Sequence, residues 1–201
     1  MTRAADVHRI CVFSGSSHGR GEQYLDQARQ VGAVLARRGI TVVYGGARVG
    51  TMGSLADGAL QAGGQVVGVI PRALVDWDVA HQGLSELHVA EDLHQRKAMM
   101  AEHADAFIAL PGGSGTLEEL FEIWTWGQLG LHTKPVGLLN VAEYFTPLVG
   151  FLDHMTREGF LHQPHRDVLL IEKDLETLLD RFAGYRPPDY AWRENPTEAT
   201  D

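Results

Sequence analysis

The feature that most constrains the fold of this chain is the repeated succession of an apolar run, a short turn and a segment with helical spacing. Apolar runs at 9–14, 40–44 and 105–110 are each followed by a turn that contains glycine. Continuous apolar runs are typical of strands buried on both faces, and their alternation with helices is typical of a parallel sheet. The pattern therefore predicts a single α/β domain, with a doubly wound, Rossmann-like parallel sheet flanked by helices.

The same patterns divide the rest of the chain into elements. Four further strands are predicted at 65–70, 86–89, 135–139 and 167–171. Helices are predicted at 22–38, 92–103, 116–129, 144–158 and 175–182, and another is predicted to run from the second glycine turn to residue 62. Residues 72–83 are predicted to form a long loop. We expect 1–184 to form the domain and 185–201, where Pro, Asp, Glu and Thr prevail, to form a poorly ordered tail.

Composition argues against several classes of partner. The formal net charge of −9 disfavours a nucleic-acid-binding surface. No run approaches the roughly 18 apolar residues of a membrane span, and the start of the chain lacks the apolar core of a signal peptide. We therefore expect a cytoplasmic protein that binds neither nucleic acid nor membrane. The single cysteine, Cys11, lies in an apolar run and is predicted to be a core residue without a disulfide.

The segment from Pro111 to Glu119 is the most informative part of the sequence for function. It follows a predicted strand, opens a predicted helix and has three glycines within four residues. Glycines allow positive φ and close approach to a ligand, and amides at a helix start attract phosphate. Glu118 and Glu119 are expected in the first turn of that helix. The segment is predicted to bind a phosphorylated ligand beside a carboxylate, although a structural turn with acidic residues that complement the helix dipole would give the same pattern.

Glycine turns follow three of the predicted strands, at Gly15, Gly45-Gly46 and Gly112-Gly113. In open parallel sheets, ligands bind beyond the carboxyl ends of the strands, near the switch in strand order. We therefore predict that the three turns line one shared cleft. None has the dinucleotide spacing G-x-G-x-x-G and no Walker lysine follows any of them, which disfavours dinucleotide and triphosphate ligands.

A second group of charged residues stands at the start of the preceding predicted helix, where Arg96 and Lys97 are adjacent. Taken alone, such a pair favours a solvated helix face over a site, and His94 alone is more typical of a surface or capping residue. His162 and His165 flank a proline in a predicted loop and have no carboxylate or cysteine companions. No metal site is therefore predicted there.

Together, these residues make the chain resemble the LOG ("Lonely Guy") family of cytokinin riboside 5′-monophosphate phosphoribohydrolases. The family motif P-G-G-x-G-T-x-x-E is met in full by 111–119, and the family's R-K pair by Arg96-Lys97. Supporting matches lie at 11–17, 69–71, 103–110, 126–130 and 134–140. The resemblance implies a nucleotide-binding catalytic domain that hydrolyses the N-glycosidic bond of N6-modified adenine riboside 5′-monophosphates, releasing the free base and ribose 5-phosphate.

The resemblance also implies roles for individual residues. Glu119 would orient the ribose or the attacking water and offset positive charge that develops on the sugar, while Arg96 would hold the nucleotide and polarise the departing base. The 5′-phosphate would be bound by residues that we call the phosphate loop: Gly112, Gly113, Ser114, Gly115 and Thr116. The other substrate-binding positions are expected to be Gly15, Ser16, Ser17, Gly45, Gly46, Asp78, Lys97, Glu118 and Thr125. The resemblance implies no metal or organic cofactor, and it implies a homodimer with Phe121 and Trp124 near the interface.

The chain departs from the family pattern at positions that bear on substrate choice. Ala47 and Thr51 stand where the family commonly has Gly and Leu, and the methyl group of Ala47 is expected to narrow the approach of the backbone to a ligand. Ser114 stands where plant relatives often have Tyr, and Asp78 where the family often has Glu.

Two other functions stay open at this point. One is the same reaction on AMP or purine nucleoside 5′-monophosphates in general. The other is a non-catalytic nucleotide or molybdenum-cofactor binding protein, which would have no use for the pair of Arg96 and Glu119. Lysine decarboxylation, a label that members of the family long carried, is disfavoured because it needs a Schiff-base lysine. Of the three lysines, only Lys97 is near the predicted cleft, and it stands beside Arg96.

Overall fold

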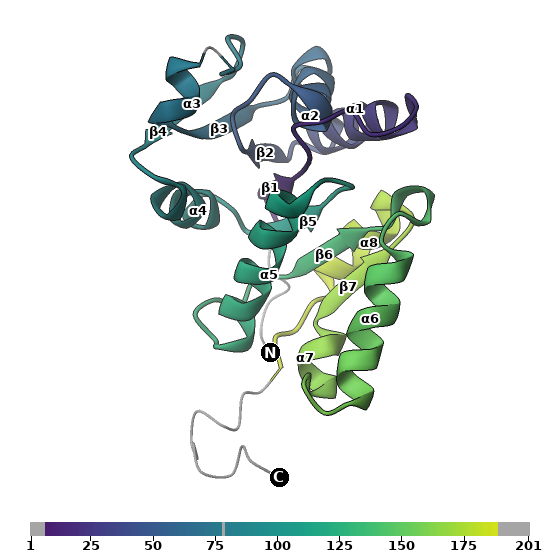
Figure 1. Cartoon of the computed structure of the whole chain (residues 1–201). Helices are drawn as coiled ribbons and strands as arrows, with labels where there is room; N and C mark the ends of the chain where they lie inside the picture. Colours follow the sequence, from purple (N-terminus) through teal and green to yellow (C-terminus); the bar gives the residue numbers. More distant parts are fainter. Residues whose placement is uncertain (1–6, 78, 189–201) are drawn as a thin grey trace.

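A computed structural model of the chain describes residues 7–77 and 79–188, and a seven-stranded sheet runs through its centre (Figure 1). The strands are β1 Arg9–Phe13, β2 Thr41–Tyr44, β3 Val66–Pro71, β4 Glu86–Ala90, β5 Ala106–Ala109, β6 Val136–Leu139 and β7 Leu169–Glu172. Every neighbouring pair is parallel, and the strand order is β4-β3-β2-β1-β5-β6-β7. The predicted doubly wound parallel sheet is confirmed.

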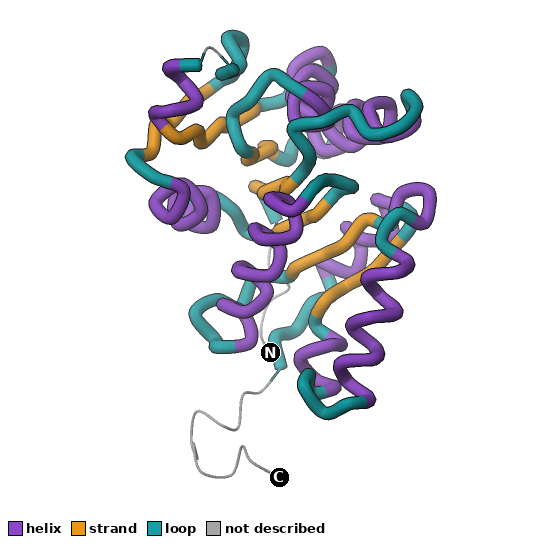
Figure 2. The backbone as a smooth tube through the Cα atoms, viewed as in Figure 1, coloured by secondary structure: helices purple, strands orange, loops and turns teal. Residues whose placement is uncertain are grey.

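Helices flank the strands on both sides (Figure 2). They are α1 Gln23–Arg37, α2 Gly50–Gln61, α3 Arg72–Asp76, α4 Leu93–Glu102, α5 Ser114–Gln128, α6 Thr146–Arg157, α7 Gln163–Asp167 and α8 Leu175–Ala183, with a short 3-10 turn, η1 Val141–Glu143, before α6.

The apolar strands contribute to two cores because successive side chains of a strand point to opposite faces of the sheet. In β1, Ile10 and Val12 pack in a cluster with residues of α1, α2 and α8. Cys11 and Phe13 pack in a second cluster with residues of α4, α5 and α6. Cys11 is buried and free, as predicted. This division explains why the central strands β1, β2, β3 and β5 are buried almost throughout rather than at alternate positions.

The switch in strand order lies between β1 and β5. The chain adds β2, β3 and β4 on one side of β1 and then returns to add β5, β6 and β7 on the other side. At the carboxyl ends, Phe13 is in register with Ala109, and the Leu110 N–H donates to the Phe13 carbonyl at 2.9 Å. The turns that follow these two strands therefore leave the sheet next to each other, at the edge where such sheets bind ligands.

Two short helices occur where the sequence predicted loops, so the loop predictions are wrong at these residues. Helix α3 occupies Arg72–Asp76 within the predicted loop 72–83, and α7 occupies Gln163–Asp167, where the two histidines were placed in a loop. Each helix has five residues, none of them buried. A helix this short and exposed has no apolar stripe, so hydrophobic periodicity could not reveal it.

The described residues bear on two other predictions. Within them, no helix is long and apolar enough to cross a membrane. At the end of the domain, Tyr185 packs against the cluster that α1, α2 and α8 cover. The predicted tail lies outside the described residues from 189 onward, as does the predicted site residue Asp78.

Candidate functional site

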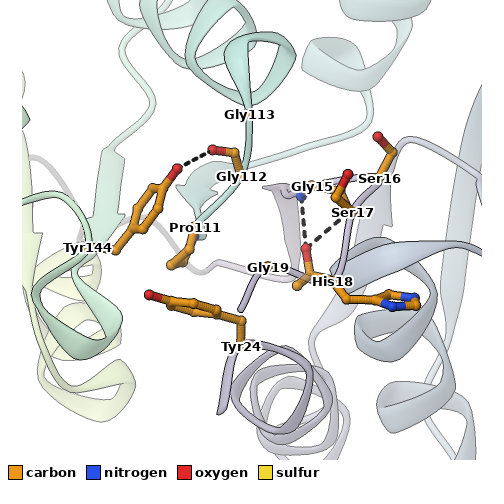
Figure 3. Close-up of a pocket in the computed structure, with 11 residues that line it drawn as sticks. Gly15, Ser16, Ser17, His18, Gly19, Tyr24, Pro111, Gly112, Gly113 and Tyr144 are labelled. Atoms are coloured by element: carbon orange, nitrogen blue, oxygen red, sulfur yellow. Dashed lines mark hydrogen bonds between the residues drawn. The ribbon is translucent and has the colours of Figure 1, made fainter. Parts of the chain in front are cut away.

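The turns after β1 and β5 enclose a pocket of about 260 Å³, which we call the glycine crevice (Figure 3). Its lining residues are Gly15, Ser16, Ser17, His18, Gly19, Tyr24, Thr51, Pro111, Gly112, Gly113 and Tyr144. The structure thus brings the predicted residues of the first turn together with the start of the phosphate loop. The turn at Gly45-Gly46 does not contribute to this lining, so the prediction of one cleft shared by three turns is not met by the crevice.

Gly112 is the position of the phosphate loop at which the surroundings exclude a side chain. A Cβ there would lie 2.8 Å from the Thr116 Cβ and 3.0 Å from the Gly15 N. A Cβ on Gly113 or Gly115 would meet no heavy atom within 4 Å, so both backbones are open to a ligand. Although glycine allows positive φ, the glycines of this loop are not among the positive-φ glycines of the described residues. Close packing, not left-handed backbone, explains Gly112.

Helix α5 begins at Ser114, two residues earlier than predicted, and its N-cap is Gly113. Because glycine has no side chain, no side-chain hydrogen bond caps this helix. The first-turn amides are therefore donors that an anion can use. The earlier start also moves Glu118 and Glu119 into the second turn. They are not first-turn residues as predicted, and compensation of the helix dipole, which falls off within the first turn, does not account for them.

Glu118 and Glu119 instead take part in a group of ion pairs between α4 and α5, which we call the ion-pair cluster. It contains Arg96, Lys97, Glu118, Glu119 and Glu122. Arg96 Nη2 lies 2.8 Å from Glu119 Oε1, while Lys97 Nζ pairs with Glu118 and lies 2.6 Å from Glu122 Oε2. The side chains of Arg96 and Lys97 are 13% and 5% exposed. The interpretation of this pair as a solvated helix face is therefore wrong.

The guanidinium group of Arg96 is held from three elements. Its Nε donates to the Val69 carbonyl of β3 at 3.2 Å, and Glu119 pairs with it from α5. From the second glycine turn, Gly45 leaves the space that the guanidinium occupies, because a Cβ at Gly45 would overlap Arg96 Nη2. The second glycine turn therefore makes room for the Arg96 side chain and does not line the glycine crevice.

Burial sets the charge states of the ion-pair cluster. Loss of hydration raises the pKa of Glu119; Arg96 opposes this rise and Glu118 adds to it. Burial alone would lower the pKa of Lys97, but its hydrogen bonds with Glu118 and Glu122 outweigh burial and raise that pKa. Lys97 is therefore held as an ammonium ion, while Glu119 titrates at a higher pH than an ordinary glutamate. Such a shifted carboxyl group can change protonation state during a reaction.

The other predicted site residues lie in different settings. Thr116 is buried against Gly112, whereas Ser114 is exposed. Thr125 is exposed too, and it stands on the face of α5 that carries Glu122, three residues earlier. It is thus close to the ion-pair cluster and not among the residues that line the glycine crevice.

The two departures after β2 have separate consequences. Ala47 is buried and forms a β-bridge with Ala80, so its methyl group packs inside the protein and does not line the glycine crevice. Thr51 Oγ1 accepts from the Gly15 N–H at 2.8 Å and donates to the Gly15 carbonyl at 3.1 Å. A leucine at this position could make neither bond. Thr51 therefore stabilises the first glycine turn through two hydrogen bonds that a leucine would not provide.

Sequence reasoning missed Glu122 of the ion-pair cluster and, in the lining of the glycine crevice, His18, Gly19, Tyr24 and Tyr144. Glu122 could have been found, since it stands four residues after Glu118 and so on the same helix face. Tyr144, whose hydroxyl donates to the Gly112 carbonyl at 2.6 Å, has no such signal because 32 residues separate the two. The two histidines near α7, His162 and His165, stack edge to face at 5.9 Å. Over the described ranges, no group of three or more His, Cys, Asp or Glu residues could hold a metal ion.

Comparison with known sequences agrees with the resemblance drawn from the sequence motifs. A family described as "Possible lysine decarboxylase" matches residues 52–182. A cytokinin riboside 5′-monophosphate phosphoribohydrolase of Rhodococcoides fascians is 52% identical over 83% of this chain and 85% of the relative. One of the Arabidopsis thaliana proteins with this name is 45% identical over 89% of this chain and 84% of the relative.

Solved structures with the same fold include proteins of other function. A molybdenum cofactor carrier protein of Chlamydomonas reinhardtii superposes with a TM-score of 0.65 at 21% identity, over 88% of this chain and 98% of that chain. A molybdenum cofactor binding protein of Rippkaea orientalis superposes with a TM-score of 0.65 at 21% identity, over 92% of this chain and 98% of that chain. At this level of identity, the likeness concerns the fold alone.

Proposed function

The chain belongs to the LOG family of cytokinin riboside 5′-monophosphate phosphoribohydrolases, and from this membership we propose that it hydrolyses the N-glycosidic bond of N6-modified adenine riboside 5′-monophosphates. In this reaction, the bond from ribose C1′ to the base breaks and its electron pair leaves with the base, which takes up a proton. The oxygen of water bonds to C1′. The products are the free base and ribose 5-phosphate.

The observation that carries the proposal is the largely buried pair of Arg96, from α4, and Glu119, from α5, 2.8 Å apart, because Glu119 stands on the helix whose N-cap, Gly113, lines the glycine crevice. Cleavage of a glycosidic bond develops positive charge on the sugar, and a nearby carboxylate stabilises that charge. We assign this role to Glu119, together with orientation of the attacking water or the ribose. Arg96 would hold the nucleotide and stabilise negative charge that develops on the departing base.

We assign the 5′-phosphate to the phosphate loop. The support is the uncapped start of α5 and the open backbone at Gly113 and Gly115. Amides at a helix start bind phosphate without a cationic side chain. Ser16 and Ser17 would contribute from the facing turn, and Lys97 and Glu118 would act by fixing α4 and α5 around the Arg96–Glu119 pair.

The description "Possible lysine decarboxylase" does not fit the charge state of Lys97. A lysine that forms a Schiff base must lose its proton, and such lysines have lowered pKa values. The two carboxylates around Lys97 raise its pKa instead. We therefore assign Lys97 a structural role in the ion-pair cluster and no covalent chemistry.

We also propose a homodimer. Trp124 is buried and its Nε1 donates to the His165 carbonyl, so this side chain belongs to the core. At the end of the same helix, Leu129 and Leu131 are 52% and 71% exposed. Two exposed leucines so near in the sequence fit a subunit contact, and sedimentation of the purified chain as a monomer would exclude that contact.

The decisive experiment is to incubate the protein with isopentenyladenosine monophosphate and with AMP, and to measure the free base. The proposal expects base release from the isopentenyl nucleotide at the higher kcat/KM. Comparable or faster release from AMP would identify a general purine nucleoside 5′-monophosphate nucleosidase. Release from neither would favour a non-catalytic binding protein. Arg96→Ala is the matched control, and it should abolish base release while the protein stays folded.

A further inference from the structure

The turn between β6 and α6 is bent in a way that proteins rarely adopt without glycine. Ala142 and Glu143 have φ values of 48° and 60°, in the left-handed region. A Cβ makes this region unfavourable, and strained residues of this kind persist where the surroundings hold them in place. The strained pair is followed directly by Tyr144, which contacts the glycine crevice.

Hydrogen bonds and packing on both sides of the turn keep Ala142 and Glu143 in this strained conformation. The Asn140 N–H donates to the Glu172 carbonyl at 2.7 Å. The side chain of Asn140 accepts from the Phe145 N–H at 2.7 Å and donates to Thr146 Oγ1 at 3.1 Å. Phe145 is buried in the core, so both ends of the turn are fixed. The position of the Tyr144 side chain follows from this fixed frame.

The hydroxyl group of Tyr144 forms a hydrogen bond with the phosphate loop. The hydroxyl donates to the Gly112 carbonyl at 2.6 Å, and its ring meets the ring of Tyr24 edge to face at 5.9 Å (Figure 3). The peptide that accepts this bond joins two glycines, and a Cβ on Gly113 would meet nothing within 4 Å. A peptide flanked by glycines rotates more freely than any other. The bond from Tyr144 therefore restrains the one peptide of the loop that has glycine on both sides.

The direction of this restraint matters for an anion. In a planar trans peptide, the carbonyl and the following N–H point in opposite directions, and the described part of the chain contains no cis peptide bond. The Gly112 carbonyl points toward Tyr144, whereas Ser16 and Ser17 lie on the other side of the loop (Figure 3). The Gly113 N–H consequently points away from Tyr144, toward the side of the loop on which Figure 3 shows the serines. If the peptide turned over, a carbonyl oxygen would face that space instead and would repel a phosphate.

We propose that Tyr144 is a positioning residue, which fixes the Gly112–Gly113 peptide so that the phosphate loop presents an N–H rather than a carbonyl to the substrate phosphate. The inference rests on the proposed function in one respect, because it takes the phosphate loop as the phosphate site. It adds Tyr144, from another part of the chain, to that site, and it assigns the strained turn the role of positioning Tyr144. Tyr144 acts on binding of the phosphate and not on the bond that breaks.

The test compares Tyr144→Phe with Tyr44→Phe, which removes a tyrosine hydroxyl that finds no hydrogen-bond partner among the described residues and does not line the glycine crevice, so the Gly112 carbonyl keeps its partner. Binding of ribose 5-phosphate is measured by calorimetry, since it requires no turnover. We expect Tyr144→Phe to raise the Kd about threefold to tenfold, the equivalent of one hydrogen bond. We expect Tyr44→Phe to bind ribose 5-phosphate as the wild type does, and the melting temperature of Tyr144→Phe to stay within about 2 °C of the wild-type value. In hydrolysis of the nucleotide, Tyr144→Phe should raise KM and leave kcat unchanged.

Three results would overturn the inference: an unchanged Kd in Tyr144→Phe, equal weakening in both variants, or no binding of ribose 5-phosphate by the wild type. A wild type that binds ribose 5-phosphate but releases no base would contradict the proposed function and leave this inference standing. A wild type that hydrolyses the nucleotide while Tyr144→Phe binds ribose 5-phosphate normally would do the reverse.

Discussion

The glycine crevice and the ion-pair cluster are neighbours along α5, yet their polarity has different sources. The crevice is lined by backbone, by serine, threonine and tyrosine hydroxyls and by His18, and it has no Lys, Arg, Asp or Glu in its lining. The ion-pair cluster consists of five ionisable side chains from α4 and α5, two of them cationic. The crevice can therefore attract an anion chiefly through dipoles, whereas the cluster holds full charges, two of them on the largely buried side chains of Arg96 and Lys97.

This difference separates two tasks of a phosphoribohydrolase. Dipoles at a helix start bind phosphate without a cation. The cations of this site are paired with carboxylates, Arg96 with Glu119 and Lys97 with Glu118 and Glu122, and so belong to the ion-pair cluster and not to the crevice. Binding of the phosphate and cleavage at C1′ should consequently respond to different substitutions. The three predictions that follow test this separation, in order of decreasing effect.

Glu119→Gln should have the largest effect. Gln can still contact Arg96 but carries no charge to stabilise the sugar, so kcat should fall roughly 10²–10⁴-fold. Ribose 5-phosphate should bind as it does to the wild type, because the crevice is unchanged. Steady-state kinetics and calorimetry measure the two quantities. Glu122→Gln, which alters a carboxylate on the same helix that pairs with Lys97, should lose far less activity. Wild-type turnover in Glu119→Gln, or loss of ribose 5-phosphate binding, would contradict the separation.

Gly112→Ala should affect the crevice and spare the cluster. The added methyl group would overlap Thr116, and overpacking of this kind costs about 1–3 kcal/mol of stability. Displacement of the loop should raise KM for the nucleotide by about tenfold or more, since it disturbs several donors at once. Gly113→Ala is the control for stability, because its methyl group meets open space at a φ of −87°. Denaturant unfolding that ranks the two variants equally would show that close packing at Gly112 is not the constraint.

The smallest expected effect is a shift in the pH profile. Burial raises the pKa of Glu119, and the proposed mechanism needs its carboxylate form. Activity should therefore fall as the pH drops through that raised pKa, which lies above the ordinary glutamate value of 4.5. Lys97 lowers the pKa of Glu119, so Lys97→Met should move the acid limb of kcat/KM to higher pH. Arg29→Met, at an exposed cation on α1, should leave the limb in place. An acid limb at the same pH in Lys97→Met would mean that Glu119 is not the titrating group.

Most of the fold could be predicted because its signals are local. The seven strands and the six longer helices each show apolar runs or helical spacing within a few neighbouring residues. The exceptions, α3 and α7, are short and have no buried residue. The start of α5 was predicted two residues too late because its N-cap is a glycine, and the sequence thus lacks the serine, threonine, asparagine or aspartate that marks most helix starts.

The candidate site also contains residues that have a local sequence signal and contacts that have none. Residues 111–119 and the pair Arg96-Lys97 could be recognised from the sequence, because the chemistry of a phosphate loop and a catalytic carboxylate requires these residue types at short spacings. The burial of Arg96 against Gly45, the bond from Thr51 to Gly15 and the bond from Tyr144 to Gly112 exist only in the folded chain. Each joins segments more than 30 residues apart, and the strand order of the sheet, not spacing along the chain, brings such segments together.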